Sequence, residues 1–501
     1  MGSRLAIAAG NKAGVEAATS VALAGGNAVD ACLASAIMAW VAEPFFASVA
    51  GSGFIAVRDP SGTVDIIDGN VAMPRSVPDA PGQGIRRVFL DYSNGMYTGA
   101  GGGAVAVPGV LAAIRTAWER HGRIEWAALF EPAIAIARDG FAFPTTSAYY
   151  LSVTWEGIWS QHAPTASLFT DADGRRIAEG EQLYQTELAE ALSMIATQGP
   201  GAFYSGEIGR AIAETIVEDG GFMTLDDLAA YNAEVRIPLR TSAFGLTIDT
   251  NPPPAVGGVV LTHMLSLLDG APMDEPEARL SSIIEAGRAA MAYRQEQYQD
   301  PEGIASAFEH ALKTVRRVSP ETTHSSAADS DGYACAVTES NGYGAGLSAH
   351  GILLNNSLGE EELNPLGTHA LPPGARCHSN MAPTIAQSEH RTIALGSPGA
   401  DRIVTAIAQT LIRIGIDGDD LGEAVAAPRA HLDSRPDGER LCYEPGLPGE
   451  ALDYPTIAYD GPHMYFGGVQ AAAVDDSGRV TAAHDPRRSG GSQVIVSTIT
   501  P

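Results

Sequence analysis

Thr322-Thr-His-Ser-Ser-Ala-Ala-Asp-Ser-Asp-Gly332 is the stretch of this 501-residue chain that decides its fold. It places a threonine at the head of a predicted strand, directly after the break Ser319-Pro320-Glu321. A threonine hydroxyl is a poor nucleophile at neutral pH unless a base lies beside it. Cleavage of the chain just before Thr322 would supply such a base, because a free α-amine titrates near ~8. The stretch therefore predicts a threonine that is activated by its own α-amine.

Composition narrows the class of protein. There are 31 Lys and Arg against 59 Asp and Glu, a net charge of −28, which argues against a nucleic-acid partner or an anionic membrane. With 45% hydrophobic residues the chain is globular and can bury a large core. Its four cysteines are widely spaced without a C-x-x-C pair, which suggests neither a zinc site nor a disulfide framework. Alternation around Cys335 predicts a small buried strand residue rather than a nucleophile.

No targeting or membrane segment is expected. The apolar run near the N-terminus has five residues, too few for the core of a signal peptide. The longest other apolar stretch, 31–42, is far short of the ~20 residues that a membrane span requires. We therefore expect a cytoplasmic protein with no membrane partner.

The hydrophobic pattern changes character at Thr322. Helical patterns dominate the first part, at 108–137, 206–217, 224–231, 258–268 and 275–298, with one strand pair at 52–57 and 64–67. Thr224-Leu-Asp-Asp227 predicts a capping box at the start of its helix. Strand patterns dominate the second part, at 323–329, 333–339, 351–355, 391–395, 470–475, 479–484 and 493–499, interrupted by a helix at 401–415. This segregation predicts an α+β layered sandwich rather than alternating βα units.

Several sequence blocks resemble the γ-glutamyltranspeptidase family of N-terminal-nucleophile hydrolases, in the same order along nearly the whole chain. Besides Thr322–Gly332 they are Gly25–Ala31, Glu43–Pro44, Val107–Gly109, Phe203–Gly206, Gly220–Tyr231, Pro252–Gly258, Ala424–Arg429 and Asp485–Arg488. The resemblance implies a four-layer αββα sandwich and self-cleavage between Glu321 and Thr322. It also implies a large subunit, 1–321, and a small catalytic subunit, 322–501, which together form one αββα unit. No metal or organic cofactor is expected, because the chain itself supplies base, nucleophile and oxyanion donors.

The resemblance also implies catalytic roles. Thr322 would attack the carbonyl of Glu321 in the precursor and later the substrate. Ser340 falls where the family has a hydroxyl residue that supports the nucleophile, but this segment is one residue shorter, so Thr338 stays an alternative. The loop Gly396-Ser-Pro-Gly-Ala400 resembles the loop whose backbone N–H groups, here those of Gly399 and Ala400, form the oxyanion hole.

Substrate-binding roles follow in the same way. Asn341 falls where the family contacts the amino-acid end of the substrate. Ser379 and Asn380 replace two neighbouring serines that hold the substrate carboxylate. Asn70 stands in the place of the arginine that clamps the glutamyl carboxylate, and an amide cannot replace that charge. Glu360 keeps a carboxylate where an aspartate grips the substrate ammonium, one methylene further out.

These departures predict diverged specificity. We expect an autoprocessed threonine hydrolase or acyltransferase that forms an acyl-enzyme from a γ-glutamyl or related acyl compound. One alternative is a biosynthetic hydrolase of the same family that cleaves a carbon–carbon bond next to a carbonyl in a bacterial secondary-metabolite (antibiotic) pathway. A second is an unprocessed, non-catalytic binding protein. The expected partner is a small acyl or amino-acid-derived molecule, and a homo-oligomer is possible.

Overall fold

The computed structural model describes residues 4–90, 96–297, 322–364, 366–435 and 438–496. Glu321, on the far side of the predicted cleavage point, lies outside the described residues.

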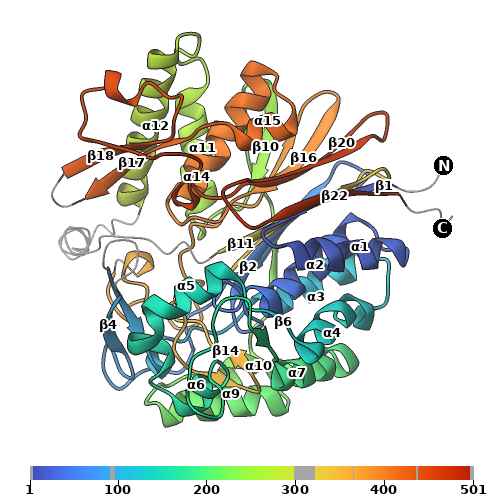
Figure 1. The fold of residues 1–501 in the computed structure, drawn as a ribbon, viewed down its shortest axis with the longest axis vertical. Helices are drawn as coiled ribbons and strands as arrows, with labels where there is room; N and C mark the ends of the chain where they lie inside the picture. The colour runs from blue at the N-terminus through green and yellow to red at the C-terminus, as the bar shows by residue number, and fades with distance from the viewer. Residues whose placement is uncertain (1–3, 91–95, 298–321, 365, 436–437, 497–501) are drawn as a thin grey trace.

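Two antiparallel sheets form the centre of the molecule (Figure 1). The first has the order β22 (Gly491–Val496), β1 (Arg4–Ala9), β11 (Thr323–Asp329), β12 (Ala334–Ser340), β2 (Ser52–Arg58), β3 (Val64–Gly69) and β8 (Glu234–Arg236). The second has the order β21 (Val480–His484), β20 (Gln470–Asp475), β16 (Arg391–Gly396), β15 (Thr384–Gln387), β10 (Leu246–Thr250) and β9 (Leu239–Ala243). Between them lies a core rich in alanine, whose small side chains let the sheets approach closely.

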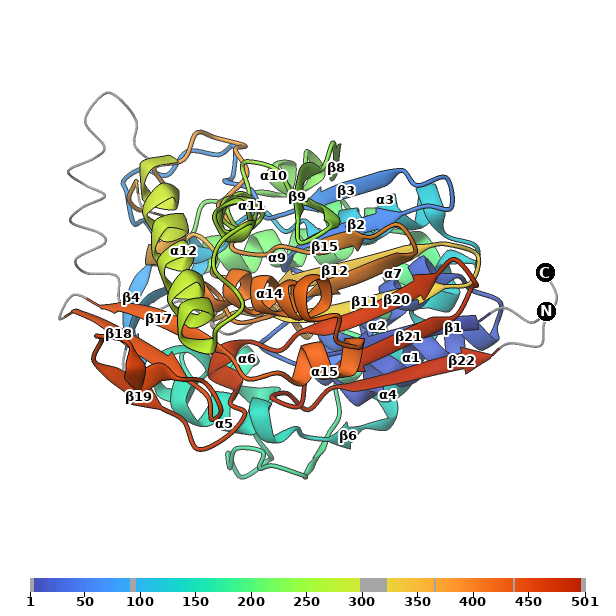
Figure 2. The same ribbon diagram turned by 90° about the horizontal axis from the view of Figure 1, so that it is seen from above.

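Helices cover the outer face of each sheet (Figures 1 and 2). Outside the first sheet lie α1 (Lys12–Leu23), α2 (Ala28–Ala42), α3 (Val110–His121), α4 (Glu131–Asp139) and α7 (Thr186–Gln198). Outside the second lie α11 (Gly257–Leu268), α12 (Pro276–Gln297), α14 (Arg402–Ile412) and α15 (Leu421–Ala426). Every residue of α2 is buried, because it lies between the sheet and the outer helices. The predicted α+β fold with αββα layers is confirmed.

Smaller elements surround this sandwich. The helices are α5 (Thr145–Thr154), α6 (Ala163–Ser167), α8 (Gly201–Tyr204), α9 (Glu207–Glu218) and α10 (Leu225–Ala229). The strands pair as β4 (Arg86–Leu90) with β5 (Met96–Ala100), β6 (Phe141–Ala142) with β7 (Gln182–Leu183), β13 (Ser348–Ala349) with β14 (Ile352–Leu353), and β18 (Gly438–Tyr443) with both β17 (Ala430–Arg435) and β19 (Thr456–Ala458).

Most predicted elements are present within a few residues of their expected bounds. The capping box at Thr224 is also present, since its hydroxyl accepts a hydrogen bond from the backbone N–H of Asp227. The sequence pattern missed β1, β8 and the pair β9–β10, which complete the two sheets from the helix-rich first part of the chain, and it also missed β15 in the second part. These strands are short, and their burial depends on partners far away in sequence.

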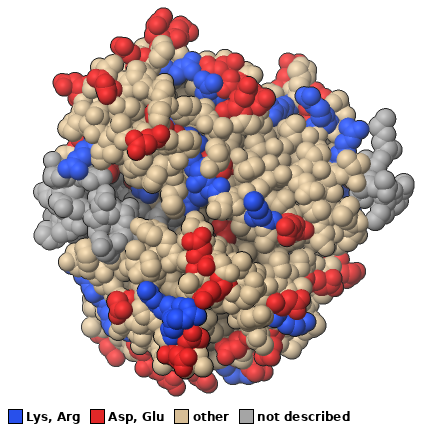
Figure 3. Space-filling model, viewed as in Figure 1, with Lys and Arg blue, Asp and Glu red and all other residues tan. Residues whose placement is uncertain are grey.

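Other expectations concern cysteines, membranes and charge. All four cysteines are free and buried, and Cys335 lies fully buried in β12 as predicted. Over the described ranges, no helix combines the length and apolar character that a membrane crossing needs. In the face shown in Figure 3, acidic side chains are widely spread and basic ones lie among them singly or in small groups.

Candidate active site

Thr322 lines a pocket of about 430 Å³ at one end of the two central sheets. The pocket gathers side chains from β2, from β12 and from the segments that follow β3 and β14 and precede β15 and α14. Seven of the nine predicted site residues within the described ranges line it: Thr322, Ser340, Asn70, Glu360, Ser379, Asn380 and Ala400. Asn341 and Gly399 are not among its lining residues.

Thr322 stands at the head of β11, a strand held on both sides by β1 and β12. Side chains alternate along a strand, so Thr322 and Thr323 point to opposite faces. The Thr323 hydroxyl donates to Oε2 of Glu43 at 2.7 Å, and the same oxygen accepts from Nδ2 of Asn11 at 2.7 Å. Burial raises the pKa of the Glu43 carboxyl. These contacts fix the strand from its helix-covered face and leave Thr322 facing the pocket, where it is only 8% exposed.

His324, two residues further along β11, lies fully buried between the two sheets. Its Nδ1 lies 2.7 Å from the Thr338 hydroxyl and its Nε2 lies 2.8 Å from the Ser326 hydroxyl. Burial lowers the pKa of His324 to about 3, so the imidazole is neutral. Thr338 is thus engaged inside the sandwich, whereas Ser340 lines the pocket with Thr322. Of the two alternatives, this geometry favours Ser340 beside the nucleophile.

The loop between β16 and α14 contains two adjacent residues with positive φ angles. Gly399 has φ +121° and Ala400 has φ +62°, both in the half of conformational space that favours glycine. Left-handed backbone costs a non-glycine residue roughly 1–2 kcal/mol, so Ala400 is tolerated at some expense. Ala400 lines the pocket that contains Thr322, which is where an oxyanion donor is needed.

Both ends of the Asn70 amide form hydrogen bonds within the protein. Its Oδ1 accepts from the Ser52 hydroxyl at 2.6 Å, and its Nδ2 donates to the carbonyl oxygen of Cys377 at 2.5 Å. The nearby guanidinium of Arg376 lies 4.2 Å from the ring centre of Tyr231 and is not among the lining residues. As far as the structure describes the pocket wall, it contains no Lys or Arg.

Three further residues complete the polar wall. Ser52 lies directly opposite Ser340 in the β2–β12 register, and Ser357 and His378 also line the pocket. Nothing in the sequence singled out Ser52 or Ser357, because their place depends on strand register and loop packing. Nδ1 of His378 lies 3.1 Å from the carbonyl oxygen of Leu363.

Asn341 is fully buried beside Ser340 but outside the pocket lining. Its backbone N–H donates to the carbonyl oxygen of Phe46 at 3.3 Å. Its side-chain Oδ1 and Nδ2 find no hydrogen-bond partner within the described part of the chain. A buried amide without partners is costly, so this side chain is a candidate contact for a polar group of another molecule.

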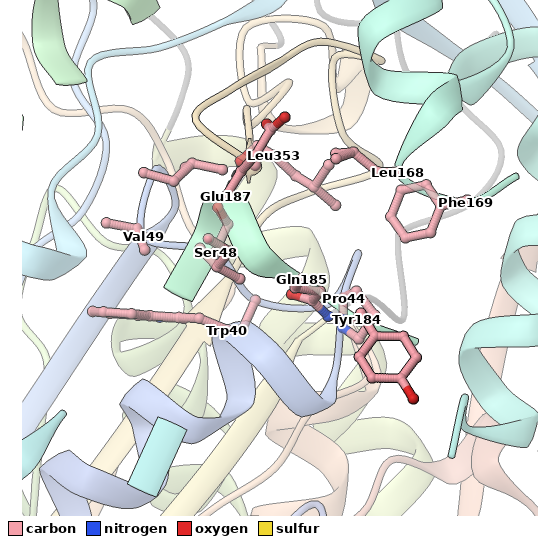
Figure 4. A pocket seen from close by; sticks show the side chains of 14 residues that line it. Trp40, Pro44, Ser48, Val49, Leu168, Phe169, Tyr184, Gln185, Glu187 and Leu353 are labelled. Atoms are coloured by element: carbon pink, nitrogen blue, oxygen red, sulfur yellow. Dashed lines mark hydrogen bonds between the residues drawn. The ribbon is translucent and has the colours of Figure 1, made fainter. Parts of the chain in front are cut away.

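A second pocket, of about 460 Å³, lies on the helix-covered side of the first sheet (Figure 4). Its walls are largely apolar and aromatic, with Trp40, Leu168, Phe169, Tyr184 and Leu353 around it. The Trp40 indole donates to Oε2 of Glu339 at 2.8 Å, so this wall of the pocket lies against the helix-covered face of β12. None of the predicted site residues lines it, so the Thr322 pocket is the candidate active site.

A threonine at the head of a central strand, between two sheets covered by helices, defines the class of N-terminal-nucleophile hydrolases. Comparison with family models adds a match to "Gamma-glutamyltranspeptidase" over residues 14–316 and 305–495. The chain belongs to the γ-glutamyltranspeptidase family. It is therefore an autoprocessed hydrolase or transferase, from a family whose proenzymes are cleaved into large and small subunits.

Individual relatives carry two kinds of name. The chain is 29% identical over 515 residues to the glutathione hydrolase proenzyme of Escherichia coli K12, covering 92% of this chain and 87% of that protein. It is 30% identical over 536 residues to the acylase ACY 1 proenzyme of Pseudomonas sp. SE83, covering 98% and 93%. A cephalosporin acylase from Bacillus halodurans has the same fold, with a TM-score of 0.82 at 23% identity over 98% of this chain and 96% of that one. The hydrolase or acyltransferase prediction is confirmed, and these matches require neither alternative.

Proposed function

We propose that this protein cleaves itself between Glu321 and Thr322 and then uses Thr322 to hydrolyse or transfer the acyl group of a small molecule. The large piece would be 1–321 and the small piece 322–501. Supporting this proposal, Thr322 shares one pocket with Ser340, Glu360 and Ala400, which come from three separate segments of the chain. The residues proposed as nucleophile, supporting hydroxyl and oxyanion donor therefore line the same pocket.

The chemistry follows from these positions. The free α-amine of Thr322 takes the proton from its own hydroxyl as the oxygen attacks the substrate carbonyl. The backbone N–H groups of Gly399 and Ala400 stabilise the tetrahedral oxyanion. The amine then returns the proton to the leaving group, and water or an acceptor amine attacks the resulting ester. Ser340 donates to the nucleophile oxygen and keeps it oriented.

The substrate we propose is an acyl compound with an amino group and without a free carboxylate next to it. The single observation that carries this specificity is the Asn70 amide, both ends of which are used within the protein. A γ-glutamyl carboxylate would therefore meet no counter-charge among the described lining residues, while Glu360 favours an ammonium. A hydrogen bond to a charged group contributes about 1.5–3 kcal/mol. We therefore expect the substrate without the carboxylate to be preferred over the γ-glutamyl compound by about 10- to 100-fold.

The first test is the intact mass of the purified protein beside Thr322→Ala. Scaling 52.0 kDa by residue number predicts pieces of roughly 33 and 19 kDa, the smaller beginning at Thr322. Thr322→Ala should remain one chain and be inactive. A wild-type protein that stays uncut under all conditions, or a Thr322→Ala variant that is cut normally, would remove the mechanism.

The second test compares three p-nitroanilides that differ in one group each. The 4-aminobutyryl compound is the γ-glutamyl compound without its carboxylate, and the glutaryl compound is the same compound without its amine. We expect kcat/KM to fall in the order 4-aminobutyryl, γ-glutamyl, glutaryl, and Glu360→Gln to reduce the difference between the first and the last. A preference for the glutaryl compound would contradict the proposed specificity.

Two further expectations from the sequence, a cytoplasmic location and a possible homo-oligomer, stay predictions. Cell fractionation and the native molecular mass in solution would check them.

A further inference from the structure

Two sequence blocks with no role in the site described above, Ala424–Arg429 and Asp485–Arg488, meet inside the molecule. Nη1 of Arg429 lies 2.7 Å from Oδ2 of Asp485, and Nη1 of Arg487 lies 3.0 Å from Oδ1 of the same carboxylate. Arg487 also donates through Nε to Oε1 of Glu444 at 2.7 Å. Arg429, Glu444, Asp485 and Arg487, here called the buried ionic cluster, are each at most 6% exposed. Two guanidinium groups and two carboxylates thus balance each other away from water.

The buried ionic cluster holds one segment of backbone, residues 463–469, at three points. Oε1 of Glu444 accepts from the N–H of His463 at 2.9 Å, and Nη1 of Arg429 donates to the carbonyl oxygen of Phe466 at 3.2 Å. Oδ2 of Asp485 accepts from the N–H of Val469 at 2.8 Å. Both ends and the middle of the segment are therefore tied to buried charges.

The same segment lies directly against the proposed oxyanion loop. The N–H of Gly468 donates to Oγ of Ser397 at 2.9 Å. Nε of Arg402, in the first turn after the loop, donates to the carbonyl oxygen of Tyr465 at 3.1 Å. Gly399 approaches so closely that a Cβ at this position would lie 3.0 Å from Cα of Gly467. The backbone of the loop rests on the backbone of the segment.

Stability alone does not account for such a cluster. Replacing a buried ion pair by apolar side chains of similar volume is often neutral or stabilising, because the charges lose their hydration. A loop that carries two successive positive φ angles does need support from its surroundings. Catalytic donors must also be held within about 0.5 Å of their productive position, and a shift of about 1 Å can cost about 10²-fold in rate.

We infer that the buried ionic cluster positions the oxyanion donors of Gly399 and Ala400 through the segment 463–469. Asp485 is its central member, because it contacts both arginines and the backbone of Val469. It acts as a positioning residue and touches no reacting atom. The inference rests on the proposed function, since it assigns a support to the oxyanion hole of that site. All these residues belong to the proposed small piece, so the support survives cleavage.

The test is Asp485→Asn, measured on processed enzyme with whichever p-nitroanilide the wild-type protein turns over fastest. We expect kcat to fall about 10- to 100-fold with KM within about twofold, since the oxyanion forms only in the transition state. A boronic acid in which boron replaces the substrate carbonyl carbon accepts the Thr322 oxygen, and the resulting tetrahedral boronate places a negatively charged oxygen in the hole, so its affinity should fall by the same factor. The affinity of the corresponding carboxamide, which forms no adduct, should not change.

Asp249→Asn is the matched control. Asp249 is also fully buried and paired, with Oδ1 2.7 Å from Nε of Arg240, but it lies on β10 away from the loop. This variant should lose stability and keep its kcat. Equal losses of kcat in the two variants would show a general structural effect and overturn the inference.

A second variant covers the case in which Asp485→Asn does not fold. Ser397→Ala removes the acceptor for the N–H of Gly468 and, within the loop, the hydrogen bond that Oγ donates to the carbonyl oxygen of Pro398. It should lower kcat in the same way, again without a change in KM. If both variants fold, their effects on kcat should be less than additive, because they act through one segment. An unchanged kcat in either folded variant, or strictly additive effects, would overturn the inference. Turnover by the wild-type enzyme in the same assay tests the proposed function separately.

Discussion

At the scale of single residues, the proposed oxyanion loop depends on the backbone conformation of two adjacent residues. Gly399 and Ala400 both have positive φ angles, but their surroundings differ. A Cβ at position 399 would lie 3.0 Å from Cα of Gly467, whereas Ala400 already carries one without a clash. The close approach of Gly467 therefore constrains position 399, whereas position 400 accommodates an alanine side chain.

We therefore expect opposite results from two substitutions. Ala400→Gly relieves left-handed strain of roughly 1–2 kcal/mol and costs about 0.5–1 kcal/mol in chain entropy, so stability should rise slightly and activity persist. Gly399→Ala should lower kcat by about 10-fold or more, because the loop must move off Gly467. Urea unfolding measures the stability of each variant, and kcat measures its activity. A fully active Gly399→Ala enzyme would contradict this account of the loop.

Two hydroxyl residues on β12 can be told apart in the same way. Ser340→Ala should lower kcat about 10-fold or more with little change in stability, since Ser340 lines the pocket. Thr338→Ala should instead lower the free energy of unfolding by about 1–3 kcal/mol, because Nδ1 of buried His324 loses its partner. Thermal unfolding and kcat, measured for both variants, show which of the two hydroxyls supports the nucleophile. The reverse pattern would make Thr338 the supporting hydroxyl.

At the scale of elements, β11 joins the two sheets as well as carrying Thr322. Nε2 of His324 forms a hydrogen bond with the hydroxyl of Ser326. That hydroxyl donates to the carbonyl oxygen of Gln470 in β20 at 3.1 Å. A Cβ on Gly396, at the end of β16, would lie 2.3 Å from Cε1 of His324. A neutral imidazole therefore fills the space beneath the start of the oxyanion loop.

This arrangement predicts a pH dependence of stability. Burial lowers the pKa of His324 to about 3, below its ordinary value of 6.5. The unfolded chain therefore binds a proton between these values that the folded chain does not. The stabilising contribution of His324 is complete above pH 6.5 and is lost as pH falls toward 3. Asp329, at the other end of β11, acts in the opposite sense, because burial raises the pKa of its carboxyl to about 6.

Comparison with His324→Gln separates the two groups, since Asp329 is common to both proteins. The difference in unfolding free energy between wild type and variant should shrink by about 1.4 kcal/mol per pH unit below pH 6.5. Urea unfolding at pH 7, 6, 5 and 4 would measure it. A difference that does not change with pH would mean that folding leaves the pKa of His324 unshifted.

At the scale of the whole molecule, strands from before and after Thr322 interleave in both sheets. In the first sheet, β1 lies between β22 and β11, and β2 pairs with β12. In the second, β10 pairs with β15. Neither piece of a chain cut before Thr322 could leave without breaking several strand ladders and exposing the alanine-rich core between the sheets.

We therefore expect the cleaved protein to behave as one particle. Size-exclusion chromatography should give a single species containing both pieces, and they should separate only in urea that also unfolds the sheets. An uncleaved Thr322→Ala sample is the reference for shape and size. Separation of the pieces under native conditions would show that the interleaved sheets are not maintained after the cut.

The sequence by itself determined what local pattern and chemical type can carry. Helix and strand periodicity, the Thr224 cap and the order of the family blocks gave most elements and the αββα class. They also singled out Thr322 and six of the residues that share its pocket, because these stand in short motifs whose chemistry depends on neighbouring residues.

Only the tertiary structure decided which of these groups is available. It engaged Thr338 with His324, used both ends of the Asn70 amide inside the protein, and placed Ser52 opposite Ser340. It also brought the Arg429 and Asp485 blocks together and inserted β1 between β11 and β22, two strands from the part of the chain after Thr322. The physical reason is that each of these contacts depends on strand register and on burial, which are set by segments far apart in sequence. Residues that are adjacent in sequence reveal neither the register nor the burial.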